Sequence, residues 1–367
     1  MPLAFTAPQE ALEAALRTAS RVVHGRPASP VLSGLLLAAD GDQVSVVGYD
    51  QAIGLRVSLP AAITGAGKAV VPAAQLGDLV ARLPAGCNVT LAVEGKSLSV
   101  EAPGTRYDVP LAWAPEDYPA LPDAPDGAGA AEIPLGLLQD ALSRVSHATA
   151  GENEGKGAAE GISLSAVGGA LRLLASDGRR ASLVDLTGLG AEGLTGVLPR
   201  ALAREISRLP GDGESLAIVA IADGLISVAV DGAAVVGNLL TGDYPPVERA
   251  FPSKHQSSIA VDADLLIGAL DRIAVFSELA LLEIDFAEAL LTVSEENDAG
   301  KGVERISLAE VEGDGTLRLA ANPKYLLTAL KSVGQAEVTI GLNGSTAPFV
   351  LEGGFHRYLV MPIATKG

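Results

Sequence analysis

The sequence predicts an α+β protein built from three repeated domains, each with two helices and about eight strands. Three observations predict this class. Two series of helical segments recur with one common period, alternating apolar strands fill the intervals, and glycine and aspartate mark tight turns. Of the 367 residues, 48% are hydrophobic and 19% are charged. The chain therefore has enough apolar material for several packed cores.

Six segments have the apolar spacing of helices, and most of them follow a proline. Proline suits the first helical position, because its missing N–H would have no partner there. The windows are 8–21, 72–82, 134–147, 199–208, 262–274 and 323–332. The first series starts at Pro8, Pro134 and Asp262, which lie 126 and 128 residues apart, and the second at Pro72, Pro199 and Pro323, which lie 127 and 124 apart. This period is far longer than that of a solenoid, so we interpret the units as duplicated domains.

The strands follow the same period. A hairpin pattern comes after each second helix, as "NVTLAVEGKSLSVEA", "SLAIVAIADGLISVAV" and "EVTIGLNGSTAPFVLEG". Linker compositions near "LPDAPDGAGA" and "FPSKHQSS" divide the chain into domains 1–124, 130–252 and 257–367. The alternative, unrelated α+β domains that match by coincidence, requires all of these patterns to agree by chance.

Cysteine content and hydropathy indicate a compartment. Cys87 is the one cysteine, which excludes an intrachain disulfide and fits a reducing cytosol. The N-terminal residues lack the pattern of a signal peptide, and no apolar run is long enough to span a bilayer. We therefore expect a cytoplasmic protein with no membrane partner.

The charge is distributed unevenly between helices and strands. The net charge is -18, yet the six helical windows hold ten basic and eight acidic residues and sum to +2, which leaves -20 for the remainder. The basic residues are Arg17, Arg21, Arg82, Arg144, Arg200, Arg204, Arg208, Arg272, Lys324 and Lys331. On a single helix such residues are best interpreted as a solvated face. Their repetition toward the C-terminal half of most helices instead indicates helices gathered on a concave face that meets a polyanion.

The sequence offers little support for an enzyme. None of the four histidines has a second histidine or cysteine at ligand spacing, so no metal site is expected. Nucleophile-elbow, phosphate-loop and dinucleotide fingerprints do not occur. Asp177, Asp223 and Asp243 lie in turns, where aspartate serves backbone geometry. We expect no catalytic residues and no cofactor.

Four short motifs occur in order: "GRPASPVL", "ASDGRRA", "GDYPPVERAFP" and the near-terminal "YLVMPI". With the three repeats, they make the chain similar, over nearly its whole length, to the bacterial DNA polymerase III β subunits, the β sliding clamps. The resemblance implies the DNA-clamp fold, with two helices of each domain on the inner face and antiparallel sheets outside. It implies a head-to-tail homodimeric ring that encircles double-stranded DNA without reading its sequence.

The resemblance also implies partners. These are a clamp-loader complex, the replicative DNA polymerase, and other DNA polymerases or repair proteins that carry clamp-binding peptides. The protein would then be a non-catalytic processivity factor. Two alternatives remain: a repeated-domain peptide-docking scaffold without a nucleic-acid role, and an acidic β-rich enzyme.

Site residues follow from the matched motifs. The implied peptide pocket contains Ser176, Gly178, Arg179, Arg180, Pro245, Arg249, Ala250, Asn322, Tyr325, Leu359, Val360, Met361, Pro362 and Ile363. The implied DNA contacts are Arg26 of "GRP" and the helical residues Arg17, Arg21, Arg82, Arg144, Arg200, Arg204, Arg208, Lys324 and Lys331. The dimer seam would join Tyr107 and Val109 to Val275 and Phe276, although these could instead be core residues of their own domains.

Three positions depart from the family pattern. Arg179 stands where histidine is common, Ala181 where leucine is usual, and the tail continues as "ATKG" beyond the usual end. We therefore expect a wider pocket and a shifted peptide preference.

Overall fold

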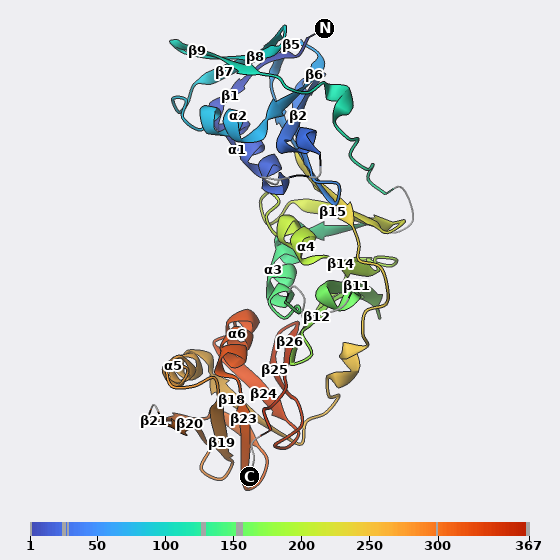
Figure 1. Ribbon diagram of the computed structural model, residues 1–367. Helices are drawn as coiled ribbons and strands as arrows, with labels where there is room; N and C mark the ends of the chain where they lie inside the picture. Colours follow the sequence, from blue (N-terminus) through green and yellow to red (C-terminus); the bar gives the residue numbers. More distant parts are fainter. Residues whose placement is uncertain are drawn as a thin grey trace. The chain divides into compact units, whose positions relative to one another are not determined.

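The computed structural model describes residues 2–23, 27, 29–125, 130–151, 157–298 and 300–364, and it is an α+β fold (Figure 1). The α-helices of the described residues are α1 (Gln9–Ala19), α2 (Ala73–Val80), α3 (Leu135–Ser146), α4 (Arg200–Ile206), α5 (Ala263–Ile273) and α6 (Pro323–Val333). Each lies at one of the six predicted windows. Short 3-10 turns are η1 (Ser20–Val22), η2 (Pro30–Ser33), η3 (Pro115–Asp117), η4 (Gly157–Glu160) and η5 (Val247–Ala250).

The helix ends correct the sequence prediction in two ways. Pro8 and Pro72 are N-cap residues that precede α1 and α2, whereas Pro323 does occupy the first position of its helix. Helices α1 and α4 end earlier than predicted, so Arg21 lies in η1 and Arg208 lies beyond α4. The predicted window 199–208 is therefore too long, and Arg208 does not continue the helix that carries Arg200 and Arg204.

Local capping explains where α5 and α6 begin and end. The Asp262 carboxylate accepts a hydrogen bond from the backbone N–H of Leu265 at 2.9 Å. The Asn322 side chain accepts one from the N–H of Lys324 at 2.9 Å. Each satisfies a donor that the first helical turn leaves without a partner. Gly334, with φ of 66°, ends α6 in the left-handed conformation that favours glycine.

Four antiparallel sheets form the rest of the described structure. The first has the order β5 (Ala62–Gly65), β1 (Ala4–Pro8), β7 (Asn88–Glu94), β8 (Ser97–Ala102) and β9 (Thr105–Pro110). The second is β10 (Ala130–Pro134), β15 (Leu216–Ala222), β16 (Leu225–Val230), β17 (Ala233–Asn238), β4 (Ile53–Pro60), β3 (Gln43–Tyr49), β2 (Gly34–Asp40) and β6 (Gly67–Pro72).

The third and fourth sheets belong to the later part of the chain. The third is β14 (Gly196–Leu198), β11 (Ile162–Val167), β12 (Ala170–Ser176), β13 (Arg180–Thr187), β26 (His356–Val360), β25 (Phe349–Gly353), β24 (Glu337–Leu342), β18 (Ser257–Asp262) and β22 (Glu310–Glu312). The fourth is β21 (Gly300–Ser307), β20 (Leu290–Asn297), β19 (Ala280–Asp285) and β23 (Thr316–Ala321).

Two strand groups recur three times in these sheets. One group is a three-stranded meander with an added strand: β6-β2-β3-β4, then β14-β11-β12-β13, then β23-β19-β20-β21. The other contains a hairpin: β1-β7-β8-β9, then β10-β15-β16-β17, then β18-β24-β25-β26. Strand β17 pairs with β4, and β26 pairs with β13, so the second repeat shares a continuous sheet with each of its neighbours.

Contacts divide the chain into two compact units. Unit 1 comprises Met1–Leu137 with Arg204–Leu239, and unit 2 comprises Leu138–Ala203 with Leu240–Gly367. The division passes through α3 and α4 because the two sheets of the second repeat are each merged with a different neighbour. Each unit has its own apolar core, packed between helices and sheets.

Candidate functional site

The turn between β12 and β13 is fixed by its own hydrogen bonds. Asp177 Oδ1 accepts from the backbone N–H groups of Arg179 and Arg180 at 2.9 and 3.0 Å, and its Oδ2 accepts from Arg180 Nε at 2.8 Å. The Ser176 hydroxyl donates to the carbonyl of Arg180 at 2.8 Å. Gly178 has φ of 83°, a conformation that favours glycine. Asp177 therefore serves turn geometry, as predicted.

The C-terminal tail lies beside this turn. The backbone N–H of Met361 donates to the carbonyl of Arg179 at 2.8 Å, and that of Ile363 donates to the carbonyl of Ala320 at 2.7 Å. A cavity of about 310 Å³ opens along the tail, and we call it the apolar cavity. Its lining residues are Arg179, Asn322, Tyr325, Met361, Pro362 and Ile363.

An apolar cluster lies next to the tail strand. It consists of Leu174, Ala181, Leu183, Phe251, Val350 and Leu359, with Tyr244 and Val247 packed against it. Tyr244, Val247 and Phe251 come from the "GDYPPVERAFP" motif, while the neighbouring Pro245, Arg249 and Ala250 are exposed. The motif therefore contributes a buried Phe251, a half-buried Tyr244, and three exposed residues beside them.

A second cavity, which we call the polar cavity, has a volume of about 470 Å³. Its lining residues are His147, Thr149, Gly151, Asp177, Arg179, Arg180, Arg200 and Tyr325. The guanidinium of Arg180 lies 4.6 Å from the centre of the Tyr325 ring, a cation–π distance. Arg179 and Tyr325 line both cavities, so the two cavities share a wall.

Buried histidines under the turn carry no charge at neutral pH. Burial, together with nearby Arg180, lowers the pKa of His147 to about 4. Burial and nearby Arg144 lower the pKa of His356 to about 4, and its ring lies 2.7 Å from the Ser182 hydroxyl. The His147 ring stacks on Tyr358 at 5.6 Å. The positive charge of the polar cavity therefore comes from its arginines.

Two of the predicted DNA contacts make structural bonds within the chain. Arg21 Nε lies 3.0 Å from the Glu205 carboxylate, in an ion pair whose N–H does not point at the oxygen, and its Nη1 donates to the carbonyl of Arg208 at 2.9 Å. Arg144 donates to Asp140 at 2.7 Å and to the carbonyls of Ser332 and Val333 at 2.6 and 2.8 Å. Both side chains are mostly buried.

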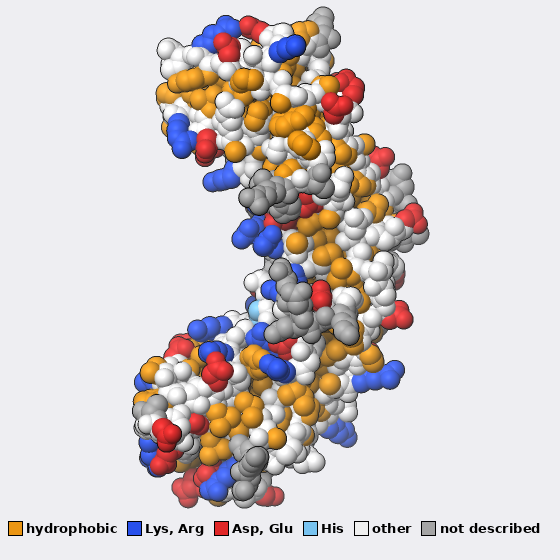
Figure 2. Space-filling model, in the orientation of Figure 1, with side chains coloured by type: hydrophobic (Ala, Val, Ile, Leu, Met, Phe, Trp, Pro, Cys, Tyr) orange, Lys and Arg blue, Asp and Glu red, His pale blue; other side chains and the backbone are white. Residues whose placement is uncertain are grey.

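The remaining helical cations are exposed. Arg82 pairs with Asp78, Arg204 with Glu205 and Lys324 with Glu278. Arg200 donates to the carbonyl of Ala150 at 3.2 Å. Arg17, Arg208 and Lys331 are also exposed, while Arg26 lies outside the described residues. Figure 2 likewise shows Lys and Arg side chains interspersed with acidic ones on the visible face.

The four predicted seam residues differ in exposure. Tyr107 on β9 is 45% exposed, and Val275 and Phe276, which follow α5, are 81% and 36% exposed. Val109 is only 1% exposed and packs in the unit 1 core. The Val109 side chain is therefore a core residue of its own domain, which was the alternative to a place in the seam.

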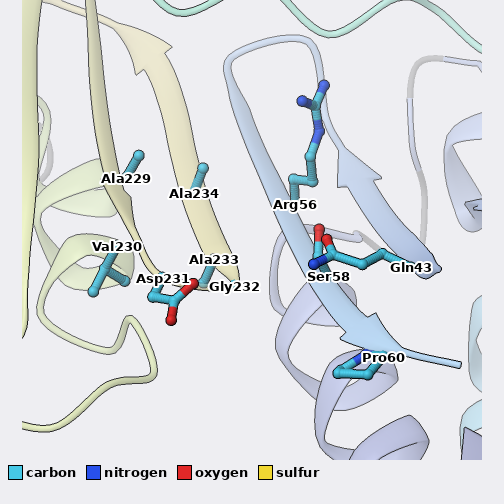
Figure 3. A pocket seen from close by; sticks show the side chains of 10 residues that line it. All are labelled: Gln43, Arg56, Ser58, Pro60, Ala229, Val230, Asp231, Gly232, Ala233 and Ala234. Atoms are coloured by element: carbon cyan, nitrogen blue, oxygen red, sulfur yellow. The ribbon is translucent and has the colours of Figure 1, made fainter. Parts of the chain in front are cut away.

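A further cavity, of about 500 Å³, lies over β4 and β17 in unit 1 (Figure 3). Small side chains such as Ser58 and Ala234 form much of its wall, and Arg56 extends away from Asp231 in this view. In the described part of the chain, no His, Cys, Asp or Glu cluster could hold a metal ion, and no helix is long and apolar enough to cross a membrane.

Known proteins match this chain along nearly its whole length. The family model of the N-terminal domain of the DNA polymerase III beta subunit matches residues 3–122 of this chain. The model of the C-terminal domain of that subunit matches residues 248–363. The beta sliding clamp of Micrococcus luteus is 30% identical over 305 residues, covering 81% of this chain and 95% of its own. The chain belongs to the family of beta sliding clamps.

Other beta sliding clamps agree with this assignment. The one from Synechococcus elongatus is 29% identical and covers 98% of both chains. A crystal structure of a sliding clamp from Pseudomonas aeruginosa bound to griselimycin has a TM-score of 0.92 at 26% identity, with all of both chains covered. The α+β clamp fold predicted from the sequence is thereby confirmed.

Of the pocket residues predicted for this sliding clamp, some meet around the two cavities and others do not. Those that line a cavity are Arg179, Arg180, Asn322, Tyr325, Met361, Pro362 and Ile363. Leu359 lies in the adjoining apolar cluster, and the fully buried Val360 belongs to the unit 2 core. Four further residues at the site, His147, Thr149, Tyr244 and Phe251, were not predicted from the sequence. The "GDYPPVERAFP" motif was the available signal for the last two.

Proposed function

We propose that this chain works as a non-catalytic DNA sliding clamp: two copies close head to tail around duplex DNA and hold polymerases on it. The division into domains 1–124, 130–252 and 257–367, with the helices on the inner face, is part of the proposal. So are cytoplasmic residence, placement on DNA by a clamp loader, and the docking of the replicative polymerase and other DNA-processing proteins through peptides.

The observation that carries the proposal is a pair of edge strands that have no neighbour on one side within the described structure, although their counterparts in the other repeats pair with each other. The second repeat joins the first through β17 and β4, and joins the third through β26 and β13. Strand β9 is the counterpart of β17 and β26, and β21 is the counterpart of β4 and β13. Both β9 and β21 are edge strands in this chain. A second copy could pair with each edge, and two copies would then leave neither edge open.

The internal junctions also predict the register of this seam. Strands β17 and β26 each begin directly after a two-residue hairpin turn, and their first residues, Ala233 and His356, pair with Val57 and Val184. Strand β9 begins at Thr105 after an equivalent turn. Its partner should therefore be the residue of β21 that corresponds to Val57 and Val184.

That residue is Glu304. The same succession of strand pairings leads to Val57, Val184 and Glu304 from Ala69, Gly196 and Leu319, each of which lies four residues before the first residue of the second helix of its repeat. The proposed seam pairs, one residue from each copy, are Thr105 with Glu304, Arg106 with Val303, Tyr107 with Gly302, Asp108 with Lys301, and Val109 with Gly300. Asp108 and Lys301 then face each other with opposite charges.

Side chains near the seam support this register. Tyr107 corresponds to Tyr358, which is fully buried and stacks on His147. Val275 corresponds to His147, because each lies two residues beyond the last buried residue of its helix. The Phe276 ring lies against Gly302, where a Tyr107 side chain from the other copy would pack. The exposed apolar groups on both edges would thus be buried together.

The basic side chains suit a ring that slides. The ones proposed to meet DNA are Arg17, Arg82, Arg204, Arg208, Lys324 and Lys331, which are exposed, and Arg26, which lies outside the described residues. Several of them have acidic neighbours, which weaken any single phosphate contact. Contacts to phosphates carry no sequence information, and weak contacts allow movement along the duplex. Arg21 and Arg144 are left out of this set because their guanidinium groups are held within the chain. Arg200 is left out of this set because it lines the polar cavity.

Topology provides the test. With a clamp loader and ATP, the protein should remain on nicked circular DNA at about 0.5 M salt and leave linear DNA of the same length, because only a closed circle prevents a ring from sliding off. Linearising the loaded circle with a restriction enzyme should release it. Equal salt sensitivity on circular and linear DNA, with peptide binding intact, would instead favour the docking scaffold.

A further inference from the structure

The polar cavity combines strong positive charge with a direct connection to the apolar cavity. Among the residues that the structure describes, three guanidinium groups, from Arg179, Arg180 and Arg200, line it with one carboxylate, that of Asp177. That carboxylate already accepts three hydrogen bonds from the turn that it fixes. The positive charge of these arginines therefore exceeds the negative charge of the carboxylate that fixes the turn.

Of the three arginines that line the polar cavity, Arg200 is the one best positioned to bind a ligand. It lies at the start of α4, it is exposed, and its hydrogen bond goes to a neutral carbonyl, that of Ala150. Arg180 differs, because its Nε is bound to Asp177 and its guanidinium lies against Tyr325. His147 is neutral at pH 7 and adds an aromatic wall. An anion would thus meet Arg200 first.

We propose that the polar cavity is a carboxylate subsite, which takes an acidic side chain of the same peptide whose apolar residues occupy the apolar cavity. This inference rests on the proposed peptide docking. A carboxylate matches the planar, multiply donating guanidinium better than a neutral amide does, and charge-assisted hydrogen bonds are about twice as strong as neutral ones. The substitution of arginine at position 179 makes this chain more selective for acidic peptides than a chain with histidine there.

A peptide is favoured over a DNA phosphate by the shared wall. Arg179 and Tyr325 line both cavities, so adjacent side chains of one extended ligand can reach both. The apolar cavity, with Met361, Pro362 and Ile363, offers a nucleic acid little to bind. An acidic peptide also gains specificity here, since the net charge of -18 repels acidic groups elsewhere on the molecule.

Matched peptides test the subsite on the full-length protein. The probes are fluorescein-labelled alanine-based peptides with a Leu-Leu pair and one glutamate placed one to five residues away on either side. Each has a counterpart with glutamine. We expect at least one spacing at which the glutamate peptide binds about tenfold tighter than its counterpart at low salt, by fluorescence anisotropy, with the ratio falling as salt rises.

Variants assign the effect to the cavity. Arg200→Gln should bring the glutamate-to-glutamine affinity ratio close to one, and Arg179→His should reduce it. Arg56→Gln, which removes one charge from an exposed position on β4 in unit 1, should leave the ratio unchanged. These three variants have nearly the same net charge, so a general charge effect would alter all three alike.

The outcomes separate the subsite from the docking function. Equal affinity for glutamate and glutamine peptides at every spacing overturns the subsite and leaves docking intact, whereas no binding by either set overturns both. A preference that persists in Arg200→Gln also overturns the subsite. If Arg200→Gln weakens binding of a short DNA duplex without changing the peptide ratio, the cavity binds phosphates and the proposal is wrong.

Discussion

Arg21 shows how a basic residue with helical spacing can serve the fold instead of a ligand. Its guanidinium donates a hydrogen bond to the carbonyl of Arg208, just beyond the end of α4. It also pairs with the carboxylate of Glu205, whose side chain is only 2% exposed. Burial lowers the pKa of Arg21, while Glu205 opposes that shift. The pair joins η1, which follows the first helix of one repeat, to the second helix of the next.

Removing the buried carboxylate should therefore be costly. Glu205→Gln leaves the Arg21 guanidinium without its counter-charge, and we expect the free energy of unfolding to fall by about 2 kcal/mol in urea denaturation. Glu283→Gln is the matched control, because its ion pair with Arg318 is exposed, and it should change stability by less than about 0.5 kcal/mol. Equal losses in the two variants would show that the Glu205 pair is no more than a surface contact.

The sequence distinguishes such residues poorly. Arg17 and Arg21 have the same spacing and charge, yet one is exposed and the other is mostly buried. The difference arises from Glu205, which is nearly two hundred residues away and reaches Arg21 only through the packing of the second repeat. By contrast, the role of Asp177 was predictable, because an aspartate before Gly178 fixes a turn through local bonds alone.

At the scale of elements, the C-terminal tail is divided between two functions. Leu359 and Val360 belong to β26, pair with β13 and are buried. Met361, Pro362 and Ile363 follow the strand and line the apolar cavity. A truncation that removes residues 359 to 367 would therefore damage the sheet as well as the pocket.

A truncation that begins at Met361 avoids this ambiguity. It should lower affinity for clamp-binding peptides by at least about tenfold, because it removes half the lining of the apolar cavity, while the thermal midpoint changes little. Peptide affinity can be measured by fluorescence anisotropy and the midpoint by circular dichroism. Unchanged peptide affinity in a folded truncation would remove the tail from the site.

Helices and turns of this chain are better determined by local sequence than the cavities are. The six helices follow from apolar spacing and caps such as Asp262 and Asn322. The polar cavity instead collects side chains from the segment that follows α3, the β12–β13 turn, α4 and α6. No local pattern places Arg200 beside Arg179, so the sequence assigned these residues to separate sites.

The whole molecule is best understood as a repeat whose last junction is missing within one chain. Two junctions of identical register are formed internally, and the third pair of edges, β9 and β21, stays open. The periodicity was visible in the sequence because duplicated helices keep their spacing. The register was not, because it depends on which strands become neighbours in the folded sheets.

A disulfide across the seam tests this account most directly. In a Cys87→Ser background, Asp108→Cys with Lys301→Cys places two thiols on directly opposed residues, at a separation that suits a disulfide. Asp108→Cys with Val303→Cys, two residues out of register, is the control. Mild oxidation of the first pair should give a single covalent product of two chains that stays linked to circular DNA in detergent. Monomers, an open ladder of oligomers, or equal crosslinking of the control pair would contradict the proposed ring.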